Sequence, residues 1–247
     1  MPSIDILGWY GKIPSLGDFA SRRLDADFIE AWDAWLAVGL SDWQASAPES
    51  WLDRYLAGPS WRFLLMPGLL PASCADHAWA GVLMPSVDRV GRYFPLTIAQ
   101  PLAQLPADGW QVESLLGWLQ QLDDLAVDAL HDDWSIEQIE AELQRIGDWH
   151  PAELNSEQVP TVFALRKPML QIHPAVGVGP LMGGLARELL LDELRGKALW
   201  LSADLQSQPV LRLSTGLPTG GDFSDLLIGA DAPVGDLSTV LSPLQPL

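Results

Sequence analysis

Two segments near the start of the chain constrain its fold more than any other feature. The first, residues 8–19, reads Gly-Trp-Tyr-Gly-Lys-Ile-Pro-Ser-Leu-Gly-Asp-Phe, and the second, residues 82–96, reads Val-Leu-Met-Pro-Ser-Val-Asp-Arg-Val-Gly-Arg-Tyr-Phe-Pro-Leu. Each passes from an apolar, strand-like start into a dense group of Gly, Pro, aromatic and charged residues. Gly and Pro at this density restrict the backbone to one path, and buried aromatic rings hold that path in place. We therefore expect two rigid surface segments that are neighbours in space.

The residues of these segments and their flanks have two interpretations. In the first, Asp18 or Asp88 pairs with a nearby arginine and joins the two segments, because a forked guanidinium suits a carboxylate. In the second, exposed arginines anchor a partner protein. The candidates for motif stabilisation or partner binding are Trp9, Lys12, Gly17, Asp18, Phe19, Arg22, Asp88, Arg89 and Arg92.

Hydrophobic periodicity and capping signals predict alternating helices and strands. Helices are expected after the capping residue Asp25, from Pro48 to Leu56, and at 181–194 and 222–228. Capping-box patterns at Asp108 and Ser135 predict two more, the second ending at Gly147. Strands are expected at 4–11, 61–66, 78–84, 93–99, 161–165, 169–172, 198–202 and 210–213. Pro95 favours an edge position for the fourth strand or a later start at Leu96, and the polar stretch 148–159 reads as a surface connection.

This alternation predicts an α/β fold, a three-layer α-β-α sandwich around a mixed and largely covered sheet. We expect a single domain over residues 1–247. Within it we distinguish the motif region (4–102), an acidic helical middle (108–157) and a C-terminal α/β part (160–229).

The charge of the chain disfavours several classes of partner. The net charge is −18, and residues 108–157 hold thirteen acidic residues against one basic residue, Arg145. Such a field repels phosphate backbones and anionic lipids, so nucleic-acid and membrane partners are not expected. The acidic middle is either a solvated surface that aids solubility or a docking site for a basic protein.

Other features of composition fit a reducing compartment and disfavour secretion. The single Cys74 rules out an internal disulfide, and neither a signal peptide nor an apolar run long enough to cross a membrane is evident. Seven of the twelve tryptophans fall before residue 80. Most must be core, because a protein that exposes many large aromatics aggregates, and a few can mark a binding face.

Catalytic and cofactor signatures are weak. The glycine-rich run 177–184 departs from the dinucleotide fingerprint in its spacing, so a packing turn explains it better. The four histidines, His77, His131, His150 and His173, lack metal-ligand spacing. Ser86 with Asp88 has no histidine nearby in sequence and favours a turn. We expect no catalytic residue, no cofactor and no metal; the alternative is an enzyme with a nucleotide or small-molecule site at 177–184 or at 86–92.

Three ordered motifs carry a family resemblance. They are Gly-Trp-Tyr-Gly-Lys-x-Pro-x-x-Gly-Asp-Phe at 8–19, Pro-x-Trp-Arg-Phe at 59–63, and Trp-x-Gly-Val-Leu-x-Pro-Ser-Val-Asp-Arg-Val-Gly-Arg-x-Phe-Pro-Leu at 79–96. Together they resemble the TagF family of type VI secretion-associated proteins, with a weaker echo at 198–201 and 216–218. The resemblance implies a cytoplasmic, non-enzymatic regulator that restrains a type VI secretion system after translation. It further implies binding to a forkhead-associated scaffold protein of the apparatus.

Overall fold

Seven strands form one sheet in the computed structural model, which describes residues 6–71, 73–151, 187–202 and 210–229. The strand order is β2-β1-β5-β4-β3-β6-β7, so neighbours in the sheet come from both ends of the chain. The strands are β1 (Gly8–Gly11), β2 (Ala20–Arg22), β3 (Trp61–Leu65), β4 (Ala78–Met84), β5 (Leu96–Leu102), β6 (Lys197–Ser202) and β7 (Val210–Thr215).

All the strand pairs of this described sheet are antiparallel, so the prediction of a mixed sheet is wrong. The helices do not act as crossovers between adjacent parallel strands. Instead, β3 and β4 are successive antiparallel neighbours, and β5 returns beside β4 before pairing with β1. A strand made of consecutive apolar residues is typically buried on both faces of the sheet. This pattern does not indicate whether the neighbouring strand is parallel or antiparallel.

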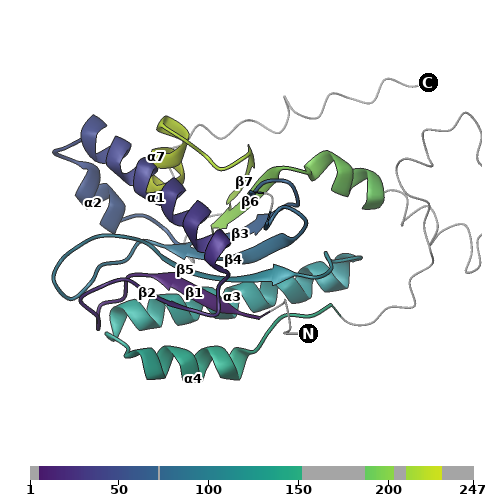
Figure 1. Ribbon diagram of the computed structural model, residues 1–247, viewed down its shortest axis with the longest axis horizontal. Helices are drawn as coiled ribbons and strands as arrows, with labels where there is room; N and C mark the ends of the chain where they lie inside the picture. The colour runs from purple at the N-terminus through teal and green to yellow at the C-terminus, as the bar shows by residue number, and fades with distance from the viewer. Residues whose placement is uncertain (1–5, 72, 152–186, 203–209, 230–247) are drawn as a thin grey trace, which may run out of the picture.

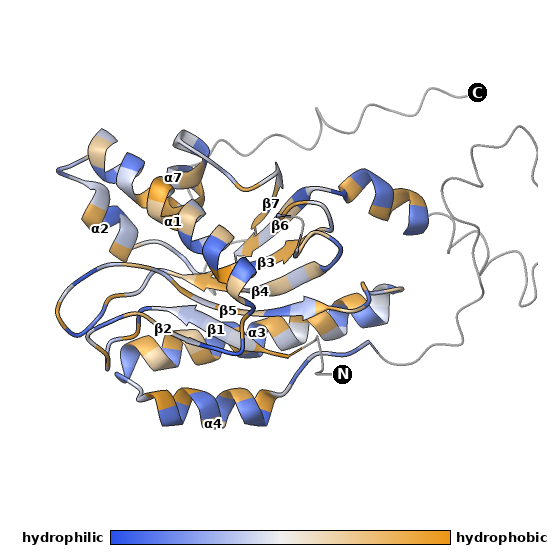
Figure 2. Cartoon of the chain, viewed as in Figure 1, coloured by the Kyte–Doolittle hydropathy of each residue, from blue (hydrophilic) through white to orange (hydrophobic). Residues whose placement is uncertain are grey.

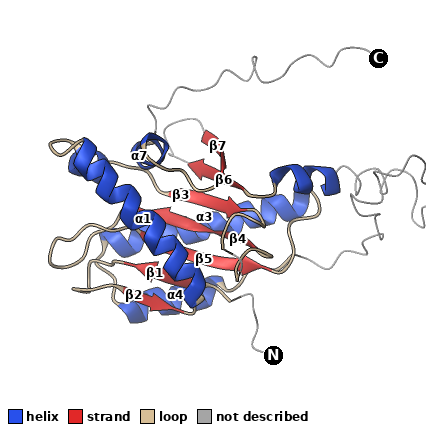
Figure 3. Ribbon diagram, turned by 45° about the horizontal axis from the view of Figure 1, so that its top comes forward, coloured by secondary structure: helices blue, strands red, loops and turns tan. Residues whose placement is uncertain are grey.

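Helices lie on both faces of the sheet (Figure 1). On one face lie α1 (Ala26–Ser46), α2 (Trp51–Leu56) and α7 (Gly221–Ile228), and on the other lie α3 (Gly109–His131) and α4 (Ile136–Ile146). Residues 187–194 are also helical. The strands lie between the two sets of helices (Figure 3). The α/β class predicted from the sequence is therefore confirmed.

Two apolar cores explain this arrangement. The pleat sends Trp61, Phe63 and Leu65 of β3 toward α1, α2 and α7, and the alternate residues of β4 toward α3. Nine of the twelve tryptophans are buried, as expected for core residues. The hydropathy colouring shows the apolar central strands and the mixed surface of α4 (Figure 2). Both β4 and β5 are buried at every residue.

Helix ends follow the sequence signals closely, with two differences. The side chains of Asp25, Asp108 and Ser135 cap their helices as predicted, and Ser135 forms a complete capping box. At α3 the Gln111 amide oxygen accepts from Ala107 rather than from the capping residue. Helix α2 begins at Trp51 instead of Pro48, because turns occupy the residues between α1 and α2.

Other corrections concern strands and the polar connection. Pro95 favoured either an edge position for this strand or a later start at Leu96. Strand β5 begins at Leu96, and it lies inside the sheet between β1 and β4 and not at an edge. The edge strand β2 was not predicted, because three residues give too short a pattern. Trp149 is buried within the stretch expected to be a surface connection. The strands expected at 161–165 and 169–172 lie outside the described residues.

Candidate functional site

The two motif segments lie side by side. Strand β1 pairs with β5 so that Gly11 faces Leu96, which brings the end of the first motif to the end of the second. Beyond the strands, the Ser86 hydroxyl donates to the Lys12 carbonyl oxygen at 2.8 Å, and the Arg89 backbone N–H donates to the Leu16 carbonyl oxygen at 2.8 Å. The prediction that these segments are spatial neighbours is confirmed.

Gly11 permits the close approach of the two segments. Its φ angle is +135°, a region that residues with a side chain rarely adopt. A Cβ atom added there would lie 2.1 Å from the Pro95 carbonyl oxygen. Glycine is therefore required at this point both by the backbone conformation and by the contact with the second motif.

Asp88 is the centre of the contact between the motifs. Its side chain is fully buried and accepts from the backbone N–H groups of Val90 and Arg92, at 3.0 and 2.9 Å. Its Oδ2 atom lies 2.7 Å from Arg92 Nε and 3.1 Å from Lys12 Nζ. We call this arrangement the carboxylate hub: Asp88 with Lys12, Val90 and Arg92.

The hub keeps Asp88 ionised. Burial by itself would raise the pKa of this carboxyl group, but hydrogen bonds from Arg92, Lys12 and the Val90 N–H together hold the pKa well below its ordinary value. Lys12, itself only 4% exposed, also lies over the Phe19 ring, with Nζ 4.8 Å from the ring centroid. The hub thus offsets the cost of burying both a cation and an anion.

Arg92 carries the link to the first motif. Its guanidinium donates to the Gly17 carbonyl oxygen and also lies 3.8 Å from the exposed carboxylate of Asp18. Because the Arg92 side chain remains half exposed and Asp18 is 85% exposed, the Asp18 pair is a weak surface contact. Of the two acidic residues considered from the sequence, Asp88 is the one that joins the segments.

Aromatic rings pack beneath the first motif. Phe19 stacks on Tyr10 with centroids 5.8 Å apart and meets Phe94 edge to face at 4.8 Å. Phe19 nevertheless remains 44% exposed. The Tyr10 hydroxyl donates to Asp33 of α1, and its pKa is raised by burial and by this carboxylate. These contacts hold the motif backbone against α1.

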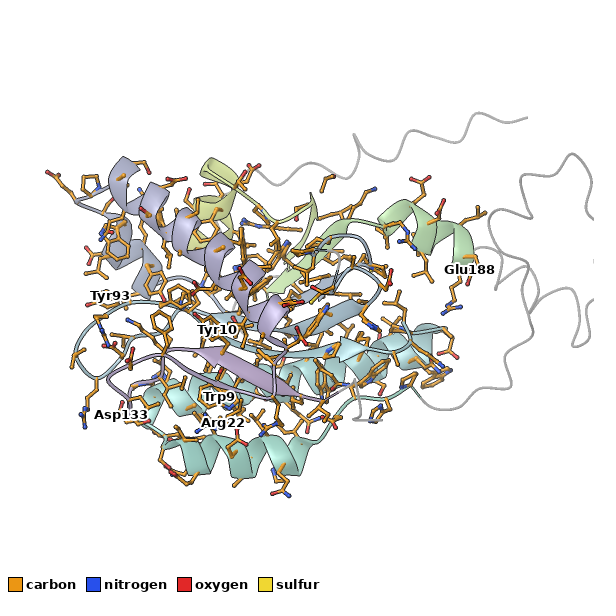
Figure 4. All side chains as sticks on the ribbon, in the orientation of Figure 1. Trp9, Tyr10, Arg22, Tyr93, Asp133 and Glu188 are labelled. Carbon is orange, nitrogen blue, oxygen red and sulfur yellow. The ribbon has the colours of Figure 1, made fainter. Side chains whose placement is uncertain are left out.

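The remaining predicted residues fall into two groups. Trp9 is buried on the opposite face of β1, and its indole N–H donates to Glu140 of α4 at 2.6 Å (Figure 4). Arg22 is exposed on β2 and donates to the neighbouring Ser21 carbonyl oxygen. Arg89 is exposed, and within the described part of the chain its side chain makes no ion pair. We call the exposed residues Arg89, Val90 and Gly91 the motif tip; Val90 is 64% exposed.

Comparison with known proteins decides the family. Residues 8–146, more than half of the chain, match the TagF N-terminal domain, described as type VI secretion system-associated. The chain belongs to this family. It is also 33% identical to PA0076 from Pseudomonas aeruginosa PAO1, whose crystal structure at 2.05 Å resolution has a TM-score of 0.69 over 92% of this chain and 96% of that one. No curated protein matches the chain significantly.

The TagF resemblance inferred from the three motifs is therefore confirmed, and the chain is type VI secretion-associated. The match covers the motifs and both acidic helices, α3 and α4, so the carboxylate hub and the motif tip lie inside the family domain. No helix among the described residues is long and apolar enough to cross a membrane.

Ser86, one residue of the enzymatic alternative, is held by several hydrogen bonds. Its hydroxyl is buried and donates to the Lys12 carbonyl, while its backbone N–H and C=O are both bound to the Tyr55 hydroxyl at 2.8 and 2.9 Å. A serine held in this way is a structural link between β4, α2 and the first motif. The run 177–184 lies outside the described residues, and the described part of the chain has no cluster of three potential metal ligands.

One feature of the site was missed from the sequence. Asp33 and Trp51, on α1 and α2, line an open groove beside Phe19, Tyr93 and Phe94. Asp33 follows the buried Trp32 on α1, and the helical pattern gives no indication of its contact with Tyr10. Only the packing of α1 against the motifs brings these residues together.

Proposed function

We propose that this chain restrains a type VI secretion system by binding a forkhead-associated scaffold protein of the apparatus. In this proposal it acts in the cytoplasm, after translation, as a regulator rather than an enzyme. Membership of the TagF family supports the secretion role, and the motif geometry supports a role in binding.

The observation that carries the proposal is the contrast between the buried hub and its exposed tip. Asp88 binds two cations and two backbone N–H groups, and the loop that it organises presents Arg89 and Val90 to solvent. A preorganised loop loses little conformational entropy when it binds. Arginine is one of the residue types enriched among the side chains that contribute most to binding at interfaces.

The packing of each arginine decides which residues are suitable for testing the motif tip by mutation. Arg92 belongs to the hub, so a charge reversal there would place a second carboxylate against Asp88 and destabilise the fold. Arg89 and Val90 can be changed with little effect on the fold, because both side chains are exposed.

The experiment compares cells that lack the protein with cells that produce the wild type, Arg89→Glu with Val90→Glu, or Arg145→Glu. The last variant reverses an exposed arginine on α4, which is not part of the motif tip. We expect the deletion strain and the motif-tip variant to export a type VI substrate more readily. Purified wild type and Arg145→Glu should capture the purified scaffold protein, and the motif-tip variant should lose at least about tenfold in affinity, about 1.4 kcal/mol.

Each part of the proposal has its own contradicting result. Unchanged export in the deletion strain would contradict the regulatory role. Wild-type protein that does not bind the scaffold would contradict the partner. A motif-tip variant with a normal melting temperature and full binding would exclude the tip and favour the acidic helices α3 and α4.

A further inference from the structure

A groove lies between α1 and the aromatic residues of the motifs. One wall is a stripe of α1 that runs from Asp33 to Gln44, and the facing wall is formed by Phe19, Tyr93 and Phe94. Trp51 of α2 lines the same groove. The groove has a volume of about 550 Å³, within the range of pockets that bind ligands.

The dimensions suit an extended peptide segment. At about 1.5 Å per helical residue, the stripe of α1 is about 16 Å long. An extended chain rises about 3.3 Å per residue, so about five residues would span the groove. Tyr10 and Tyr93, which flank Phe94, lie on the α1 side of the sheet (Figure 4).

The negative charge of the groove favours a positively charged occupant. Asp33 is the one charged residue among those that line it. Helix α1 carries four acidic residues, Asp27, Glu30, Asp33 and Asp42, and no basic residue. One oxygen of Asp33 accepts from the Tyr10 hydroxyl, which fixes the direction of the carboxylate. A cationic side chain would therefore find a fixed negative group in the groove.

The aromatic walls favour the same occupant. A guanidinium or ammonium group is attracted to the face of an aromatic ring within about 6 Å of its centroid. The described part of the chain already uses this interaction between Lys12 and Phe19, and again between Arg212 and Trp61. A guanidinium has the further advantage that its planar surface stacks on rings while its N–H groups reach a carboxylate.

From these observations we infer that the groove binds an extended segment of a partner protein and holds an arginine side chain of that segment between the aromatic wall and Asp33. The inference rests on the proposed protein-binding function and adds the chemistry that the partner must supply. It adds a second contact at Tyr93 and Phe94 of the second motif segment. At this contact the partner supplies the cation, whereas at the motif tip this chain supplies it through Arg89.

The test uses two capped pentapeptides as probes, glycine-leucine-arginine-leucine-glycine and its twin with citrulline in place of arginine. Citrulline keeps the shape of arginine and lacks its charge. The full chain is titrated with each peptide, and binding is followed by NMR chemical shifts. The protein variants are Asp33→Asn, whose amide oxygen still accepts from Tyr10, and the control Asp42→Asn, which removes an exposed carboxylate of α1 outside the groove.

We expect the wild type and Asp42→Asn to prefer the arginine peptide over the citrulline peptide by about tenfold, since a charge-assisted hydrogen bond and stacking are both lost with citrulline. In Asp33→Asn the preference should fall below about twofold. Three results would overturn the inference: no saturable binding to the wild type, equal binding of the two peptides, or the same loss of preference in Asp42→Asn.

Scaffold capture separates this inference from the proposed function. Reduced capture by Asp33→Asn supports the groove as part of that interface. Equal capture by wild type and Asp33→Asn overturns the assignment of the groove to the scaffold while the regulatory proposal stands. Failure of the wild type to capture the scaffold overturns the regulatory proposal, whatever the peptides do.

Discussion

Asp88 and Asp123 are two buried aspartates near arginines, and their pKa values shift in opposite directions. Asp88, in the second motif, is bound by four donor groups from three residues, and its pKa is lowered. Asp123, on α3, lies 3.8 Å from Arg62, and its Oδ1 atom has no hydrogen-bond partner within the described structure. Burial raises the pKa of Asp123, and Ser60 and Arg62 only partly oppose that effect.

The difference shows that burial beside an arginine does not decide the state of a carboxyl group. What decides it is the number and direction of donors that replace water. At Asp88, backbone N–H groups of the loop bind the carboxylate together with side-chain cations. These hydrogen bonds hold the loop in one conformation around the charge. At Asp123 the pair with Arg62 is long, and Arg62 also donates to Gln120 at 2.8 Å. The motif hub is therefore expected to stabilise the fold more than the α3 pair.

The largest effect is expected for Asp88→Asn. The substitution leaves Lys12 buried without its anion and removes acceptors from the loop. We expect the melting temperature to fall by about 10 °C at neutral pH, as for a buried ion pair that loses one partner. Asp18→Asn, at an 85% exposed side chain, is the matched control and should leave the melting temperature nearly unchanged. Equal melting temperatures for wild type and Asp88→Asn would contradict the hub.

Acid should remove most of that difference. Because folding lowers the pKa of Asp88, its stabilisation is complete above the unfolded-state pKa of about 3.9 and is lost as the pH falls toward the lower folded-state value. The melting temperatures of wild type and Asp88→Asn should therefore converge between about pH 4 and pH 2. Thermal melts across this range measure the effect, and a constant difference would show that Asp88 does not titrate with folding.

A smaller effect is expected for Lys12→Met. Methionine keeps the apolar stem and removes the ammonium group, while Arg92 and two backbone N–H groups continue to bind Asp88. We expect a loss of about 2 kcal/mol in the free energy of unfolding, the range for a hydrogen bond to a charged group. Urea denaturation measures it. A loss as large as that of Asp88→Asn would mean that Lys12 carries the whole hub.

The smallest effect is expected for Asp123→Asn. The substitution removes a carboxylate that burial disfavours, and the amide oxygen can still face Arg62. We expect a change within about 1 kcal/mol in the free energy of unfolding at neutral pH. Since the pKa of Asp123 is raised, the variant should gain relative to wild type as the pH rises above about 4. A large destabilisation would contradict the expectation that the Asp123–Arg62 pair stabilises the fold less than the carboxylate hub does.

Much of the local structure could be predicted because its signals lie within a few residues of one another. Asp25 and Ser135 cap their helices through contacts two or three residues ahead, and β4 matches its predicted bounds, 78–84. Strand β2 and the position of β5 inside the sheet could not be predicted, since they depend on pairing with residues far away in sequence. The same reason explains why Asp33 was missed: its partner Tyr10 is 23 residues away.

The sequence by itself determined the family, the α/β class and the two motif segments, because these depend on residue order and short-range periodicity. It also limited the residues expected to join the two motif segments to a few charged side chains. Only the tertiary structure decided that Asp88 rather than Asp18 joins the segments and that Lys12 is a partner. It likewise decided that Arg92 is structural while Arg89 is exposed. A charged residue acts through the donors and the solvent around it, and the pairing of β1 with β5 sets those neighbours at the hub.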